Sequence, residues 1–220
     1  MNPDLKTNSR RVLEPDERIS EVLFGLIMVL TFTGSLSVAD AGRDDVRAML
    51  IGALGCNLAW GIIDGVLYLM GSLADKGRNL MTLRAVRQAA DLRKAQELIA
   101  AALPSTLASV LQPDELESIG RRLRELPEPP DKAHLDRKDW LGAVGVFVLV
   151  FLSTFPVAVP FIFIERIGPA MRVSNAIAIA LLFLAGMAYA RCVGRSAWAV
   201  GLVMVVLGGI LVALTIALGG

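Results

Sequence analysis

Five stretches of this sequence are long and apolar enough to cross a lipid bilayer as helices. The hydrocarbon core of a bilayer requires about 20 mostly apolar residues per helix. Only helices satisfy their own backbone hydrogen bonds at such lengths in lipid. Hydrophobic residues make up 55% of the 220-residue chain. The predicted spans are residues 19–39, 48–70, 140–164, 174–190 and 197–218. The sequence therefore predicts an all-α integral membrane protein with five transmembrane helices.

The polar segments divide the chain into four predicted parts. Residues 1–18 are a polar tail, 19–70 hold the first two spans, 71–139 form a loop, and 140–220 hold the last three spans. In the loop, apolar residues recur at helical spacing over 79–102, and Pro104 ends that pattern. Two further helices are predicted, over 105–111 and from Pro113 to about Leu126. The loop is therefore expected to be a small helical domain.

The distribution of Lys and Arg predicts the orientation of the spans. These residues are concentrated in the tail, at both ends of the 71–139 loop and in the 191–196 turn. The remaining two loops hold only Arg43, Arg47, Arg166 and Arg172. Positive charge favours the cytoplasmic side. We therefore expect a cytoplasmic N-terminus and helical domain and an external C-terminus. The expected location is the plasma (inner) membrane, although a vacuolar membrane fits the same topology.

Two carboxylates lie inside the first two spans at matching depth. Glu21 is 16 residues from Ser37, and Asp64 is 16 residues from Ala48. In adjacent antiparallel helices, both acids lie roughly 24 Å from the outer end. Ionisable residues in spans are costly and point to function. A facing pair of carboxylates predicts a site for a cation or a shared proton.

Other residues at helical spacing extend this candidate site. Asn57, Gly61, Asp64 and Tyr68 form one stripe on the second span. Met28 shares a face of the first span with Glu21 and Gly25, and a thioether suits softer transition metals. Gly25, Gly61 and Gly65 are predicted to allow close helix packing. Asn57 and Met28 are therefore predicted to assist the two acids.

These residues also have purely structural interpretations. Glu21 can be an interfacial acid that reaches water, paired with Arg18. Asn57 and Asp64 can form a polar packing seam without a ligand. In the third span, Pro156 and Pro160 interrupt the hydrogen-bond ladder. They predict either a bent helix that lines a path or a kink that neighbouring helices tolerate.

Several classes of function lack support in the sequence. The net charge of +1 gives no electrostatic basis for binding nucleic acid. The sequence shows no nucleophile–base set, phosphate loop or zinc-type Cys/His spacing, so an enzyme is not expected. No permanently bound cofactor is predicted, and the expected surroundings are the lipid bilayer.

The order of the segments resembles that of the vacuolar iron transporter family. The similarity lies in the last hairpin, with Arg191, Gly194-Arg195-Ser196, Gly201, Gly208-Gly209 and Gly219-Gly220, and in the span with Pro156 and Pro160. The resemblance implies a homodimer that exchanges iron or manganese for protons. Glu21 and Asp64 stand approximately where the family carries acids, but the loop lacks the family's regular series of glutamates.

Two hypotheses follow from these patterns. The first is a transporter for Fe²⁺ or Mn²⁺ that uses Glu21, Asp64, Asn57 and Met28. The second is a non-transporting membrane scaffold or regulatory protein, which keeps the spans and uses the basic 84–94 segment to bind a partner or anionic lipid.

Overall fold

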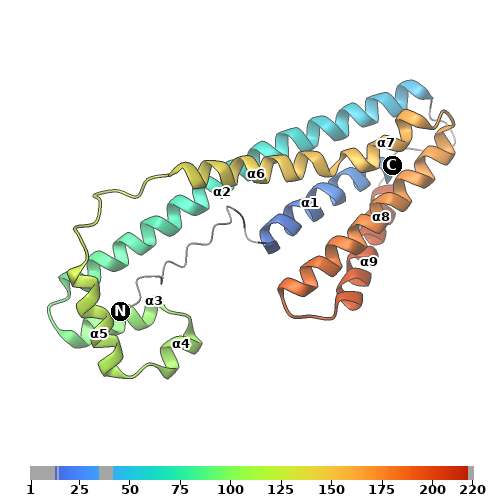
Figure 1. Cartoon of the computed structure of the whole chain (residues 1–220). Coiled ribbons are helices and arrows are strands. Elements are labelled where there is room, and N and C mark those ends of the chain that lie inside the picture. Colours follow the sequence, from blue (N-terminus) through green and yellow to red (C-terminus); the bar gives the residue numbers. More distant parts are fainter. Residues whose placement is uncertain (1–12, 14, 35–41, 218–220) are drawn as a thin grey trace, which may run out of the picture. The chain divides into compact units, whose positions relative to one another are not determined.

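The computed structural model describes residues 13, 15–34 and 42–217, which form helices and the connections between them, with no strand (Figure 1). The helices are α1 (Pro15–Gly34), α2 (Arg43–Gln88), α3 (Leu92–Ala102), α4 (Ser105–Val110), α5 (Pro113–Glu125), α6 (Arg137–Ser153), α7 (Phe155–Phe163), α8 (Ile167–Cys192) and α9 (Ala197–Ala217). Most of the predicted tail lies outside the described residues. So do residues 35–39 of the first predicted span and Leu218 at the end of the last.

The chain divides into two compact units. Unit 1 comprises Met1–Tyr68 and Lys138–Gly220, and unit 2 comprises Leu69–Arg137. Unit 2 covers nearly the same residues as the loop predicted over 71–139. Helix α2 is longer than the predicted span 48–70, because it continues as a helix to Gln88. No proline interrupts residues 71–88.

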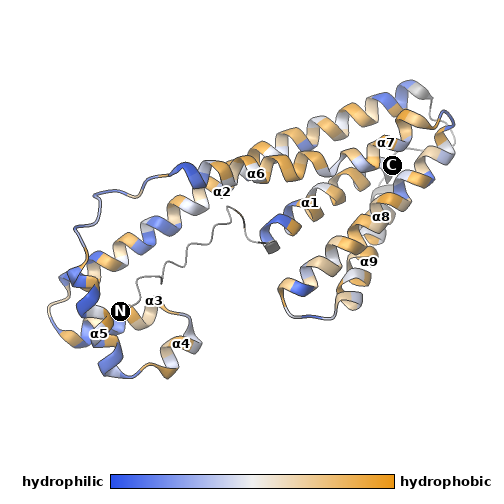
Figure 2. Ribbon diagram, in the orientation of Figure 1, coloured by the Kyte–Doolittle hydropathy of each residue, from blue (hydrophilic) through white to orange (hydrophobic). Residues whose placement is uncertain are grey.

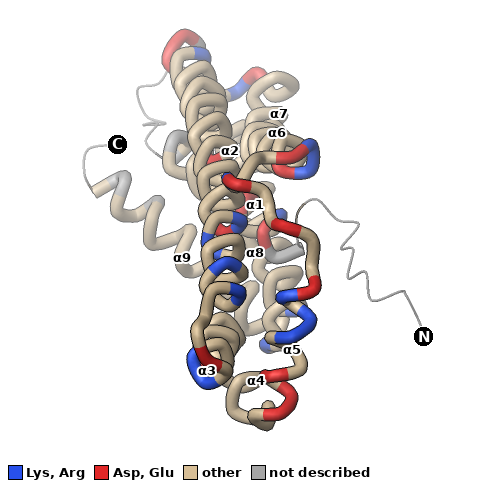
Figure 3. The backbone as a smooth tube through the Cα atoms, turned by 90° about the vertical axis from the view of Figure 1, so that its left-hand side faces the viewer, with Lys and Arg blue, Asp and Glu red and all other residues tan. Residues whose placement is uncertain are grey.

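Three helical segments in the described part of the chain are long and apolar enough to cross a membrane. They are Asp44–Gln88, Arg137–Phe163 and Ile167–Cys192. The apolar segment Ala197–Leu211 is shorter, and α9 carries no charged residue (Figure 3). The first turns of α1 are charged, with Asp16, Glu17, Arg18 and Glu21. Apolar residues dominate the helices of unit 1 (Figure 2). Five spans therefore remain a prediction, of which three are supported by length and composition.

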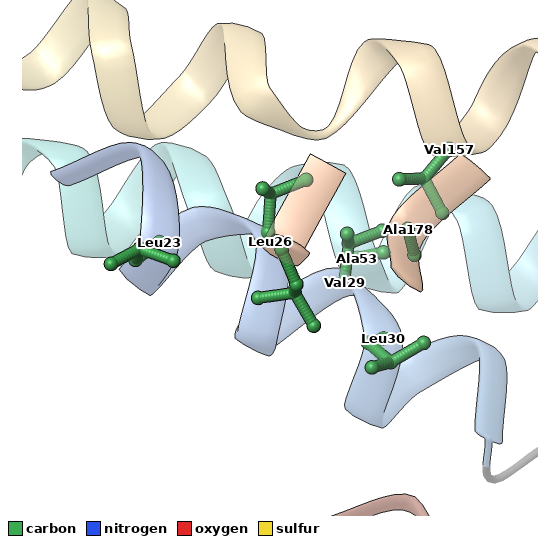
Figure 4. Packing of buried hydrophobic residues seen from close by; sticks show 8 residues of the cluster. Leu23, Leu26, Val29, Leu30, Ala53, Val157 and Ala178 are labelled. Carbon is green, nitrogen blue, oxygen red and sulfur yellow. The ribbon is translucent and has the colours of Figure 1, made fainter. Parts of the chain in front are cut away.

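Helix α8 is central to the packing of unit 1, because it packs against α1, α7 and α9. The main hydrophobic core is formed by α1, α2, α7 and α8 (Figure 4). Its fully buried members include Val29 of α1, Ala53 of α2, Val157 of α7 and Ala178 of α8. This core holds α1 and α2 against α7 and α8.

The third predicted span comprises α6 and α7, which meet at Thr154. Pro156 lies in the first turn of α7, where a missing N–H costs little, and Pro160 lies inside α7. The Ser174 hydroxyl of α8 donates a 2.7 Å hydrogen bond to the Val157 carbonyl. Pro160 is buried and Pro156 is exposed. The backbone of Thr154 keeps helical angles (φ −70°, ψ −34°), so the chain continues from α6 into α7 through the segment that carries the prolines.

Unit 2 corrects one prediction. Residues 79–102 do not form one helix, because α2 ends at Gln88 and α3 begins at Leu92. The Asp91 carboxylate accepts a 2.6 Å hydrogen bond from the Lys94 backbone N–H, and this cap starts a new helix. Helices α3 and α5 then pack together around Val86, Ala95, Ile99 and Leu116.

The basic end of α2 has a structural role in unit 2. Arg87 donates to the backbone carbonyls of Leu123, Arg124 and Leu126, at the C-terminal end of α5. Arg84 donates to the Pro130 carbonyl at 2.7 Å. Because both side chains bind unit 2 itself, two of the basic groups that the scaffold hypothesis assigned to a partner are already engaged.

Candidate functional site

Glu21 and Asp64 line one cavity of about 340 Å³ in unit 1. Helix α1 brings Glu21 to the cavity, and α2 brings Asp64. The complete lining, named here the carboxylate cavity, is Leu13, Glu17, Ser20, Glu21, Asp64, Leu67, Tyr68, Val146 and Tyr189. The matching depth expected from the sequence therefore corresponds to a shared cavity.

Both carboxylates are half-buried. In the described part of the chain, neither accepts a hydrogen bond nor forms an ion pair. Arg18 forms no ion pair with Glu21 among the described residues, and its Nε donates to the Leu13 carbonyl at 3.1 Å. Two acids without a cationic partner lower the electrostatic potential in the cavity, which favours a bound cation or proton.

Helix packing fixes the positions of the two acids. Gly25 lies one turn after Glu21, where an added Cβ would be 2.7 Å from the Val150 carbonyl oxygen. Gly61 and Gly65 lie on either side of Asp64. A Cβ at Gly61 would be 3.2 Å from the Phe147 carbonyl oxygen, and one at Gly65 3.1 Å from that of Ala143. All three glycines thus lie where α6 passes closely.

Asn57 lies outside the carboxylate cavity, in the packed seam. Its side chain is fully buried, and Nδ2 donates to the Gly25 carbonyl at 3.4 Å and to the Thr154 hydroxyl. It therefore connects α1 and α2 with the junction of α6 and α7. Asn57 is thus hydrogen-bonded to neighbouring helices, as expected if it belongs to a polar packing seam. Asp64, which the same interpretation placed in the seam, instead lines the cavity.

The remaining predicted residues also lie outside this cavity. Met28 is half-buried on α1, and neither Pro156 nor Pro160 lines the cavity. Across the described residues, no three His, Cys, Asp or Glu side chains come together as a group that could hold a metal ion. One chain therefore lines the cavity with three carboxylates, Glu17, Glu21 and Asp64, which do not converge as a set of metal ligands.

A model of the VIT (vacuolar iron transporter) family matches residues 77–220, about two thirds of the chain. The chain belongs to the VIT family. No curated protein matches the sequence. Membership of the VIT family indicates a membrane transporter of metal ions. The matched residues cover unit 2 from Gly77 and the helices α6 to α9, whereas Glu21, Asn57 and Asp64 precede them. Assigning those residues a function therefore depends on the geometry of the cavity.

Two cavity residues of this VIT-family protein were not selected from the sequence. Glu17 lies one turn before Glu21, so the spacing of the two acids signals that they share a face of α1. Tyr189 lies on α8, and no sequence pattern connects it with Glu21 or Asp64. The Thr154 hydroxyl accepts a hydrogen bond from Asn57 Nδ2. In the sequence, the only feature that draws attention to Thr154 is that it lies just before Pro156.

Proposed function

We propose that this VIT-family protein exchanges a divalent metal ion, Fe²⁺ or Mn²⁺, for protons across the membrane. The observation that carries the proposal is the cavity shared by Glu21 and Asp64, whose carboxylates have no cationic partner in the described residues. Ionised carboxylates bind hard and borderline cations. The metal is the transported substrate, and no permanently bound cofactor is proposed.

Protons compete with the metal for the same oxygen atoms. A protonated carboxyl group carries no charge, so metal binding weakens as the pH falls. A site that releases metal on the acidic side and binds it on the other couples metal movement to a pH gradient. Metal is therefore expected to move towards the more acidic compartment.

The acidic pair is also the basis for proposing a homodimer. A divalent cation usually takes four or more ligands, and the carboxylates that one chain brings to the cavity do not converge as a metal-binding group in the described residues. A two-fold axis beside the cavity would bring together the acids of two copies. The orientation with a cytoplasmic N-terminus in the plasma membrane completes the proposal.

The test compares transport by Glu21→Gln, Asp64→Asn and wild-type protein in liposomes. Each variant removes a charge with little change of shape, so Fe²⁺ and Mn²⁺ uptake should fall at least tenfold, since even outer-shell changes cost about 10–100-fold in metal affinity. Glu128→Gln is the matched control, because Glu128 is exposed in unit 2 and should leave uptake unchanged. Full uptake by Asp64→Asn would contradict the assignment, and no uptake by folded wild-type protein would favour a scaffold.

A further inference from the structure

The turn between α8 and α9, residues 191–196, carries two exposed arginines where two apolar helices meet. Arg191 lies in the last turn of α8, and Arg195 lies shortly before α9 begins. Every residue of this turn is exposed. The turn is hydrophilic, whereas α8 and α9 are mostly apolar (Figure 2). The sequence after Glu165 contains no Asp or Glu, so the positive charge of the turn is not balanced from either helix.

The backbone holds the two arginines at a closed helix end. Gly194 has φ +66°, in the left-handed region that favours glycine. The Arg195 backbone N–H donates to the Ala190 carbonyl at 2.9 Å, which is the bond that closes a helix in a Schellman motif. Arg191 and Arg195 therefore lie on either side of one well-defined turn.

The guanidinium groups of Arg191 and Arg195 are not engaged within the described part of the chain. Neither side chain forms a hydrogen bond or an ion pair with a described residue. By contrast, Arg84 and Arg87 donate to backbone carbonyls of unit 2. A guanidinium presents five N–H donors in a planar arrangement that fits phosphate oxygens. The turn therefore offers two sets of donors to an anionic group.

Trp198 indicates where this turn lies relative to a membrane. It belongs to the first turn of α9 and is 72% exposed. Its ring packs on Phe183 of α8, with the ring centroids 5.4 Å apart, which restricts its orientation. Tryptophan is enriched at membrane surfaces, where its ring lies at the level of the lipid headgroups. An exposed tryptophan that closely follows Arg195 therefore places the arginines near lipid phosphates.

The turn lies at the same end of unit 1 as the carboxylate cavity. Tyr189, close to the end of α8, lines that cavity together with Glu17 at the start of α1. The distribution of Lys and Arg predicts that this end is cytoplasmic. The cytoplasmic leaflet carries anionic lipids, which attract arginines near its surface. The predicted orientation thus favours an anionic lipid as the ligand.

We propose that Arg191 and Arg195 bind the phosphate of an anionic phospholipid, with Trp198 beside the headgroup. A free phosphate ion shares this chemistry, but the exposed apolar side chains of Val193 and Leu202 offer contacts that only a lipid uses. No residue of this site lines the carboxylate cavity, so the inference does not depend on the proposed transport function.

The first test measures how strongly brominated lipids quench the fluorescence of Trp198. Trp60→Phe/Trp140→Phe leaves Trp198 as the single tryptophan of the chain. The protein is placed in phosphatidylcholine vesicles that contain brominated phosphatidylglycerol or, at the same mole fraction, brominated phosphatidylcholine. Quenching by the anionic lipid should be at least about threefold stronger, because two arginines near the membrane surface favour that lipid by on the order of tenfold.

Two double variants of this single-tryptophan protein decide the result. Arg191→Gln/Arg195→Gln should make the two lipids quench equally. Arg166→Gln/Arg172→Gln is the matched control and should keep the preference, because these arginines are also exposed but lie at the opposite end of α8. Equal quenching before any arginine is changed, or a preference that survives Arg191→Gln/Arg195→Gln, would overturn the lipid site. An excess of inorganic phosphate should leave the preference unchanged, and its loss would assign the turn to a free phosphate ion.

A second measurement keeps all three tryptophans. Native mass spectrometry of the full chain, released from detergent that contains phosphatidylglycerol and phosphatidylcholine, counts the lipids that stay bound. Arg191→Gln/Arg195→Gln should retain at least about threefold less phosphatidylglycerol than the wild type. Equal retention by the two proteins would contradict the site. Neither measurement involves metal transport, so its failure is distinct from a failure of the proposed function.

Discussion

Single residues determine how closely the helices of unit 1 approach one another. Gly25 shows this most sharply, because a Cβ there would be 1.9 Å from the Ser153 Oγ and 2.7 Å from a backbone oxygen. The side chain of Ser153 could rotate, but the Val150 carbonyl is part of α6 and cannot move alone. The position of Glu21, one turn away on α1, therefore depends on the absence of a side chain at residue 25.

The substitution Gly25→Ala should destabilise the protein. Overpacking typically costs about 1–3 kcal/mol, which corresponds to a fall in Tm of about 2–12 °C for a chain of this size. The measurement is thermal unfolding of the purified protein in detergent. Gly55→Ala is the control, because a Cβ added at Gly55 would meet no described atom within 4 Å beyond its own helix. It should be neutral or stabilising by up to about 1 kcal/mol. Equal effects of the two substitutions would contradict the close approach at Gly25.

Much of the candidate site could be predicted from residue spacing, and some could not. The shared depth of Glu21 and Asp64 follows from counting residues along two antiparallel helices. The separation of Asn57 from Glu21 and Asp64 could not be predicted in this way. Asn57 and Asp64 share one face of α2, but their spacing does not show which neighbouring helix covers each of them. Thr154 and Tyr189 come from distant segments, so their positions depend on tertiary packing.

At the scale of helices, the ends were harder to predict than the helices themselves. Helix α5 begins at Pro113 as expected, and Gln112 and Glu115 form a capping box there. The break between α2 and α3 was missed, because apolar periodicity runs through residues 79–102 while Asp91 caps a new helix. A local side-chain hydrogen bond thus outweighed the longer pattern.

Arg87 is expected to stabilise the end of α5. It donates to three backbone carbonyls, so Arg87→Ala leaves them without this partner and should cost about 1–3 kcal/mol locally. Amide hydrogen exchange of the full chain should become about 10- to 100-fold faster in α5. Arg93→Ala, at an exposed position of α3, is the control and should leave exchange in α5 unchanged. If amide hydrogen exchange in α5 is unchanged in Arg87→Ala, Arg87 does not stabilise the end of α5.

At the scale of the whole molecule, the number of spans is the main open structural prediction. Five spans place the two ends of the chain on opposite sides of the membrane, whereas four would place them on the same side. Reporter tags at the N- and C-termini, tested for accessibility in intact and permeabilised cells, distinguish the two. The positive charges of the loops predict an inaccessible N-terminus and an accessible C-terminus in intact cells. Two termini on one side would contradict the five-span arrangement.

The most direct test of proton-coupled metal transport measures both ions at once. Wild-type protein in liposomes is given Fe²⁺ or Mn²⁺ outside and an acidic interior, and metal entry is recorded together with the internal pH. Proton-coupled exchange predicts metal uptake that requires the pH gradient and is accompanied by a rise in internal pH as protons leave. Metal entry that is equally fast without a pH gradient and moves no protons would contradict the exchange mechanism.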